Sequence, residues 1–64
     1  MKIMIQADRL RVKEPDKAQR ALIKAYHALL QIEENGDDLL IIGEPSRLYH
    51  LLFALAAKYD VDLI

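Results

Sequence analysis

The fold of this chain is decided by the stretch Asp38-Leu39-Leu40-Ile41-Ile42-Gly43. Four consecutive apolar residues are typical of a buried strand, because a strand with one solvated face alternates apolar and polar side chains. The continuous run therefore predicts a strand that is covered on both faces, as in the middle of a parallel sheet. A second helix follows at Pro45, because the N–H that proline lacks is not used at the first helical position.

Before this strand, residues 14–34 predict one long helix. Pro15 suits the first helical position and Asp16 suits the positive end of the helix dipole. Asn35 and Gly36 tolerate the left-handed backbone that ends many helices. The predicted core stripe repeats at spacings of three and four and consists of Ala18, Leu22, Ala25, Leu29 and Ile32, widened by Ile23, Tyr26 and Leu30.

The chain opens with two short segments of period-two alternation, residues 2–6 and 9–13. If residues 7–8 form a tight turn, the two segments make a hairpin whose apolar pairs share one face, with Ile5 opposite Leu10 and Ile3 opposite Val12. The turn lacks the glycine that two-residue hairpins prefer. A strand followed by an extended connection is therefore the alternative.

Residues 61–64 predict a short last strand. Together the elements give a single domain over residues 1–64, a small two-layer α/β sandwich of order β(β)αβαβ. We expect a largely parallel sheet of three to four strands with two helices, because right-handed crossovers join parallel strands. The helices then lie on one face of the sheet, or on both faces if the first strand is central.

Composition is that of a globular protein and excludes several kinds of site. Apolar residues make up 53% of the 64 residues and charged residues 30%, and there is no cysteine. Disulfides, thiol nucleophiles and cysteine-ligated zinc are therefore excluded. The chain has no signal-peptide pattern, so we expect a cytoplasmic protein with no membrane partner. The net charge of −1 divides into +4 over residues 1–30 and −5 over residues 31–64.

The second predicted helix, residues 46–59, is apolar almost all round, whereas a surface helix of a small monomer keeps a broad polar face. With its leucines against the sheet, the helix still leaves an adjoining apolar face that consists of Tyr49, Phe53, Ala56 and Ala57. Exposed aromatic residues are typical of an interface. We therefore expect a homo-oligomer, a dimer first, that uses these four residues. The alternative is that the first helix and residues 7–13 cover this face within one chain.

Basic side chains are concentrated in one third of the chain, namely Arg9, Arg11, Lys13, Lys17, Arg20 and Lys24. If residues 9–13 form a strand, its three basic side chains share one face and can contact the phosphates of nucleic acid or another polyanion. The alternative is a solvated face that is balanced by Glu14, Asp16 and the acidic half of a neighbouring protomer. No aromatic residues interleave with these charges.

No constellation of residues predicts catalysis, a cofactor or a metal site. His27 and His50 lie on different predicted helices without a second ligand at metal-binding spacing. Ser46 has no histidine at a fixed spacing, so a nucleophile is not indicated. The turn after Gly43 carries Glu44 where an anion would bind. We therefore expect that this protein is not an enzyme.

The order of segments resembles that of a known family. Residues 7–15 (ADRLRVKEP), a helix, residues 36–42 (GDDLLII), a proline-started helix and a last strand are similar to the TusA/SirA-like sulfur-carrier family. The resemblance implies a small cytoplasmic two-layer α/β domain with a Cys-Pro-x-Pro motif, whose cysteine carries a persulfide. Aligned on Pro15, the cysteine position is Val12 and the first proline position is Lys13. The first helix is longer here and the family's last strand is missing. Since valine holds no persulfide, the resemblance implies a docking domain without sulfur transfer.

The sequence leaves three functional hypotheses. The leading hypothesis is a non-enzymatic α/β protein that self-associates, or binds another protein, through the second helix. The second is a binder of nucleic acid or another polyanion through the basic N-terminal segment. The third is the cysteine-less docking domain. A further alternative is an idealised, designed chain with no function, which the similar strand-to-helix turns at Pro15 and Pro45 would suit.

Overall fold

The computed structural model describes residues 1–64 and contains five strands and two helices. In chain order these are β1 (Lys2–Gln6), β2 (Arg9–Val12), α1 (Lys17–Lys24), β3 (Gln31–Asn35), β4 (Asp38–Ile42), α2 (Pro45–Ala56) and β5 (Asp62–Leu63). The strands form one sheet in the order β3-β4-β2-β1-β5, in which only β1 and β5 are parallel. The predicted largely parallel sheet of three to four strands is therefore wrong. The cause is that residues 25–35 form a turn and a strand instead of the end of a helix.

Strands β1 and β2 form the hairpin that was one of two alternatives for the start of the chain. Their register pairs Ile5 with Leu10 and Ile3 with Val12, as the shifted alternation predicts. Ala7 makes the turn with a φ of 51°, a backbone region in which hairpins usually place glycine or asparagine. A slip of one residue would expose the buried face of both strands, so burial fixes this register.

The second hairpin joins β3 to β4 through a two-residue turn and replaces the end of the predicted helix. Gly36 lies at a φ of 63°, and Asn35 pairs with Asp38 across the turn. The Asn-Gly pair therefore marks a hairpin and not a helix end. Helix α1 stops at Lys24 and is followed by consecutive turns, which lead into β3.

Helix α1 also starts later than predicted. Asp16 is its N-cap and forms a capping box: the Asp16 carboxylate accepts the N–H of Gln19 at 2.8 Å, and the Gln19 side chain accepts the N–H of Asp16 at 2.9 Å. Ile23 is the one fully buried residue of the helix. The predicted core stripe is wrong at three exposed positions, which are Ala18, Ala25 and Leu29.

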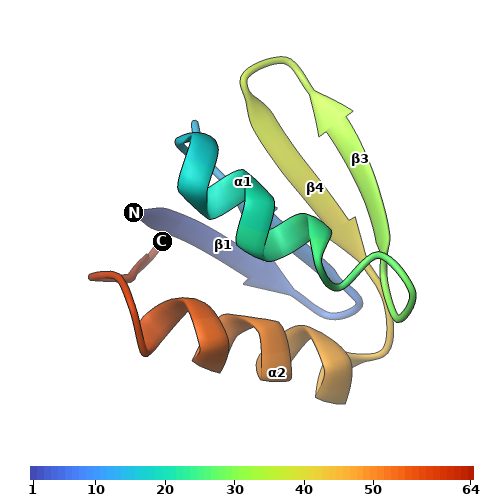
Figure 1. The fold of residues 1–64 in the computed structure, drawn as a ribbon. Coiled ribbons are helices and arrows are strands. Elements are labelled where there is room, and N and C mark those ends of the chain that lie inside the picture. The colour runs from blue at the N-terminus through green and yellow to red at the C-terminus, as the bar shows by residue number, and fades with distance from the viewer.

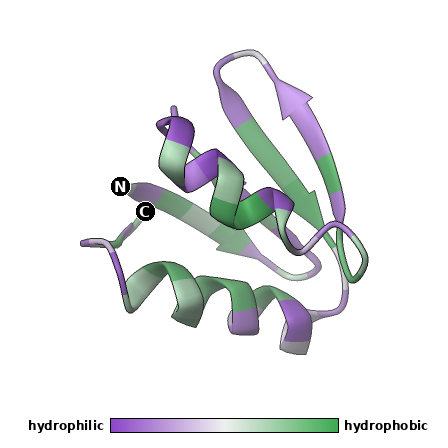
Figure 2. Ribbon diagram, in the orientation of Figure 1, coloured by the Kyte–Doolittle hydropathy of each residue, from purple (hydrophilic) through white to green (hydrophobic).

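Both helices lie on the same face of the sheet (Figure 1), and the core lies between them and that face. Figure 2 shows the apolar residues running along α2 and along β1 and β4. Helix α2 begins at Pro45 as predicted and contributes four leucines. The core consists of Ile3, Leu10, Val12, Ile23, Leu30, Leu39, Ile41, Leu48, Leu51, Leu52 and Leu55.

The opposite face of the sheet has no helix over it. Leu39 and Ile41 of β4 point toward the helices and are fully buried, whereas Leu40 and Ile42 alternate onto the open face and are half-buried. The prediction that both faces of this strand are covered is therefore wrong. Only every second residue of its continuous apolar run belongs to the core.

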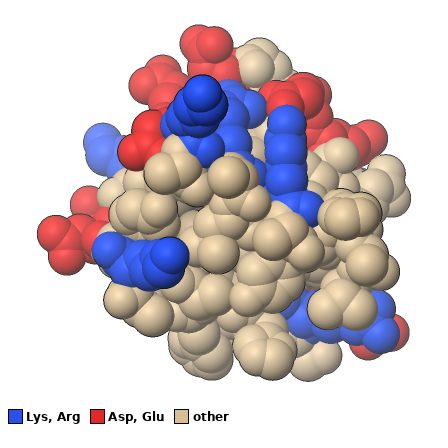
Figure 3. Space-filling model, in the orientation of Figure 1, with Lys and Arg blue, Asp and Glu red and all other residues tan.

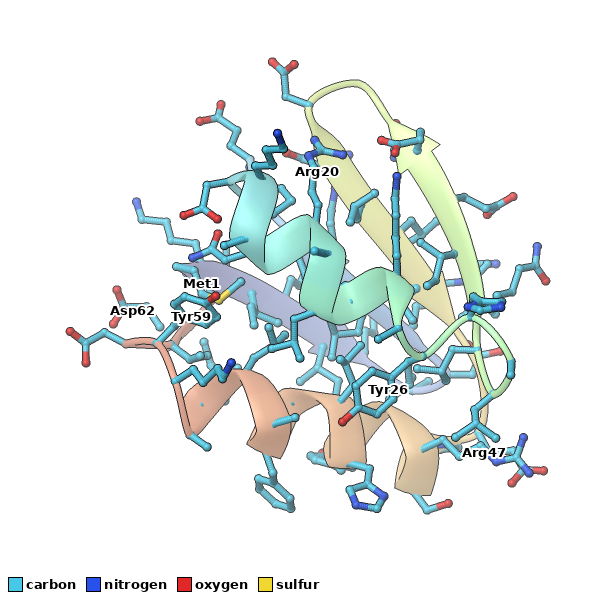
Figure 4. The ribbon with its side chains drawn as sticks, in the orientation of Figure 1. Met1, Arg20, Tyr26, Arg47, Tyr59 and Asp62 are labelled. Carbon is cyan, nitrogen blue, oxygen red and sulfur yellow. The ribbon has the colours of Figure 1, made fainter.

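Strand β5 closes the sheet beside β1 and brings the two ends of the chain together (Figure 1). The N–H of Asp62 donates to the carbonyl of Met1 at 2.8 Å, and the N–H of Ile64 donates to the carbonyl of Ile3 at 3.0 Å. Met1 and Tyr59 pack against the core at this end of the molecule (Figure 4).

Candidate interaction surface on the second helix

The outward side of α2 carries a stripe of residues that no other element covers. At about 100° per residue, six exposed residues fall within a third of the helix circumference, and we name them the α2 stripe: Ser46, Tyr49, His50, Phe53, Ala56 and Ala57. Phe53 lies at its centre, on the side of the helix opposite the buried leucines. Tyr49 and Ala56 lie on one flank of Phe53, and His50 and Ala57 lie on the other.

Two aromatic rings dominate this stripe. Phe53 is 66% exposed and Tyr49 is 46% exposed. Their ring centroids are 6.3 Å apart and their planes are tilted by 38°, as side chains four residues apart on a helix allow. The alternative that α1 and residues 7–13 cover these rings within one chain is therefore wrong.

Charged side chains lie at the ends of the α2 stripe. Arg47 donates from Nη1 to the carbonyl of Leu29 at 3.3 Å, and its Nε lies 4.0 Å from Glu44. These contacts hold Arg47 at the N-terminal end of α2 (Figure 4), while Asp60 is exposed beyond the other end. Figure 3 shows charges gathered around α1 and the β3–β4 turn, and a broad uncharged surface toward α2.

The six residues of the predicted polyanion site are divided between two elements. Lys17, Arg20 and Lys24 lie on α1, where Arg20 Nη1 is 2.8 Å and Lys24 Nζ is 3.3 Å from the carboxylate of Glu34. Arg20 also donates to the carbonyls of Pro15 and Asp37, reaching the β3–β4 hairpin (Figure 4). Hydrogen bonds from Arg20 and Lys24 hold the pKa of Glu34 below its ordinary value. Most of the α1 charge is therefore engaged within the fold.

The other three basic residues, Arg9, Arg11 and Lys13, belong to β2 and the residue after it, and alternation places them on the open face of the sheet. The carboxylate of Asp38 accepts the backbone N–H of Glu14 at 3.0 Å and Nε of Arg11 at 3.1 Å. These two contacts hold the pKa of Asp38 below its ordinary value. Arg9 and Lys13 remain exposed.

The open face also contains apolar residues that the sequence interpretation did not count as surface. A shallow hollow there is lined by Met4, Gln6, Arg9, Arg11, Asn35 and Leu40. Met4 is 41% exposed. The alternation of β1, with Ile3 buried, was the signal that Met4 points away from the core.

The histidines do not come together with other ligands. Nδ1 of His27 lies 2.9 Å from the carbonyl of Lys24 in the turn after α1, whereas His50 belongs to the α2 stripe. No group of three or more histidine or acidic side chains is arranged to hold a metal ion. Neither helix has the length and hydrophobicity that crossing a bilayer requires.

Val12, the residue at the cysteine position of the sulfur-carrier resemblance, is fully buried within β2. Comparisons of the chain with protein-family models, with curated proteins and with solved structures found no match. Function is therefore inferred from the surfaces of this chain alone.

Proposed function

We propose that this chain is a non-enzymatic protein-interaction domain that self-associates through the α2 stripe. The observation that carries the proposal is the exposure of Phe53 at the centre of that stripe, 66% of its surface, next to a half-exposed Tyr49. Contiguous exposed apolar surface of this kind is typical of protein interfaces, and aromatic residues are enriched there. The charged groups lie at the ends of the stripe, which leaves an uncharged centre for contact.

Burial of the two rings supplies the main favourable term. Phe53 and Tyr49 together expose about 200 Å² per chain. At roughly 25 cal/mol per Å², covering them in both chains contributes on the order of 10 kcal/mol, and the loss of translational and rotational freedom offsets much of that. We therefore expect a reversible dimer that dissociates at about micromolar concentrations, and not an obligate one.

Light scattering over a hundredfold concentration range tests the proposal. The wild-type chain is expected to rise from the mass of one chain to twice that mass. Phe53→Glu places a charge at the centre of the stripe, where desolvation opposes association, and is expected to remain monomeric throughout.

The matched control is Met4→Glu, which adds the same charge at an exposed apolar residue on the opposite face of the sheet. It is expected to dimerise like the wild type, with both variants folded by circular dichroism. A wild-type monomer at every concentration, or equal masses for wild type and Phe53→Glu, contradicts the proposal.

A second candidate function is binding of a polyanion by the open face of the sheet. It is supported by Arg9 and Lys13, which are exposed on the side of β2 that no helix covers, with Arg11 between them. Nucleic acid or heparin is the chemical class that such a strip of cations attracts. The acidic side chains nearby and the net charge of −1 limit this candidate to contacts along β2.

Retention on heparin tests the second candidate with two double variants of equal charge. Arg9→Gln with Lys13→Gln removes cations from the open face, whereas Lys17→Gln with Lys24→Gln removes the same number from α1. If the polyanion binds through the sheet, only the Arg9→Gln, Lys13→Gln variant elutes from heparin at a lower salt concentration than the wild type, because its binding releases fewer counterions. Equal loss in both pairs, or no retention of the wild type, argues against it.

A further inference from the structure

We propose that the partner of the α2 stripe is a second copy of this chain whose α2 runs antiparallel, with the two-fold axis at Phe53. This inference rests on the proposed self-association and adds its orientation. In a two-fold interface the same patch meets itself, so the patch must be self-complementary. The distribution of large and small residues along the α2 stripe meets this requirement in one orientation.

Each flank of Phe53 carries a larger side chain toward the N-terminus of α2 and an alanine toward its C-terminus. Tyr49 precedes Ala56 on one flank, and His50 precedes Ala57 on the other. The two-fold axis lies in the interface, perpendicular to the helices, and passes between the two Phe53 residues. Rotation about it reverses the helix direction and keeps each flank on its own side. Tyr49 then lies against Ala56 of the partner subunit, and His50 lies against Ala57 of the partner subunit.

The levels along the helix agree with these contacts. Tyr49 lies four residues before the axis and Ala56 three residues after it, so their levels in the paired helices differ by about 1.5 Å of helical rise. His50 and Ala57 differ by the same amount. The two Phe53 side chains meet at the axis, so we expect the helices about 9 Å apart, within the usual range of roughly 8–10 Å, and the alanines leave room for the facing Tyr49 and His50 rings. A parallel pair would exchange the flanks, so that Tyr49 lies against the partner's His50, large on large, and Ala56 lies against the partner's Ala57, small on small.

The helix dipoles favour the same orientation, because the positive end of each α2 lies beside the negative end of the other. The side-chain charges at the two ends do not decide between orientations. Glu44 and Arg47 are exposed at the N-terminal end of α2 and Lys58 and Asp60 at its C-terminal end, so each end carries one charge of either sign.

Disulfide trapping tests the orientation, because the chain contains no cysteine of its own. His50→Cys and Ala57→Cys are prepared separately and oxidised alone and as an equimolar mixture. The antiparallel pair brings residues 50 and 57 of opposite subunits within the roughly 4.4–6.8 Å between Cα atoms that a disulfide spans. Identical residues lie about 9–12 Å apart along the helix. Cross-linked dimer is therefore expected to be several-fold more abundant in the mixture than in either variant alone.

Two controls separate this inference from the self-association on which it rests. Adding Phe53→Glu to both cysteine variants is expected to abolish the cross-link, which excludes random collision. A wild-type dimer by light scattering, with cross-links formed equally or better within each single variant, overturns the antiparallel arrangement alone. A monomeric wild type overturns both proposals.

Discussion

The backbone of Ala7 lies at a φ of 51°, in the left-handed region that costs an L-residue about 1–2 kcal/mol. Glycine adopts this region without that cost, but it loses more conformational entropy on folding than alanine does, which lowers the free energy of unfolding by about 0.5–1 kcal/mol. We therefore expect Ala7→Gly to raise the free energy of unfolding by about 0.5–1 kcal/mol, measured by urea denaturation.

The same substitution within a helix provides the control for this residue. Ala21 is exposed in α1, and Ala21→Gly is expected to lower the free energy of unfolding by about 1 kcal/mol, because glycine is a poor helix former. The two changes remove the same methyl group and differ in sign only if Ala7 is strained. A loss of stability in both variants contradicts the strain.

Asp38 is the residue that links the turn before α1 to the sheet, and its environment predicts a loss of stability in acid. The backbone N–H of Glu14 and the guanidinium of Arg11 hold the pKa of Asp38 below its ordinary value. A carboxyl with a lowered folded-state pKa stabilises the fold above its unfolded value of about 4, and this contribution disappears as the pH falls through the folded-state pKa.

Asp38→Asn is expected to be less stable than the wild type at pH 7 and to lose less stability on acidification. The control is Asp60→Asn, which changes an exposed carboxyl whose side chain makes no hydrogen bond or ion pair within the fold. Denaturation curves at pH 7 and pH 3 check both variants. Parallel acid losses in wild type and Asp38→Asn would show that the contact does not set the pH dependence.

At the scale of the element, the local pattern predicted the register of the first hairpin and the start of α2, and it failed where pairing with another strand overrides helix propensity. The β1–β2 register and the start of α2 follow from alternation and from Pro45. Residues 25–34 are rich in helix-forming residues, but β4 pairs with β2 along one edge only, and β3 pairs with its other edge, with Ile32 opposite Ile41. Tertiary pairing thus overrides helix propensity here, and the Asn-Gly turn was the sequence signal for it.

The identity of β3 is tested by a residue that suits strands and not helices. Glu33 is exposed in β3, and Glu33→Thr is expected to raise the free energy of unfolding by about 0.5 kcal/mol because threonine favours strands. The control, Ala18→Thr at an exposed position of α1, is expected to lower it by about 0.5 kcal/mol. If residue 33 were helical, both substitutions would destabilise the protein.

At the scale of the whole molecule, the candidate surface was predictable because it depends on one helix, whereas the open face depends on the sheet. The apolar excess of α2 predicted the exposure of Tyr49 and Phe53 without knowledge of the topology. The open face required the knowledge that both helices pack on one side, which no local pattern contains. Leu40 was assigned to a covered face for that reason.

Self-association of the whole molecule predicts that thermal stability depends on protein concentration, because only folded chains form the dimer. Above the dissociation constant, each tenfold increase in concentration is expected to raise the Tm by about 3–5 °C for a domain of this size. Phe53→Glu is expected to remove this dependence, while its Tm stays close to that of the dilute wild type. The reason is that Phe53, being largely exposed, contributes little to the core of the monomer. A wild-type Tm that is constant over a hundredfold range of concentration would leave the α2 stripe without a role in assembly.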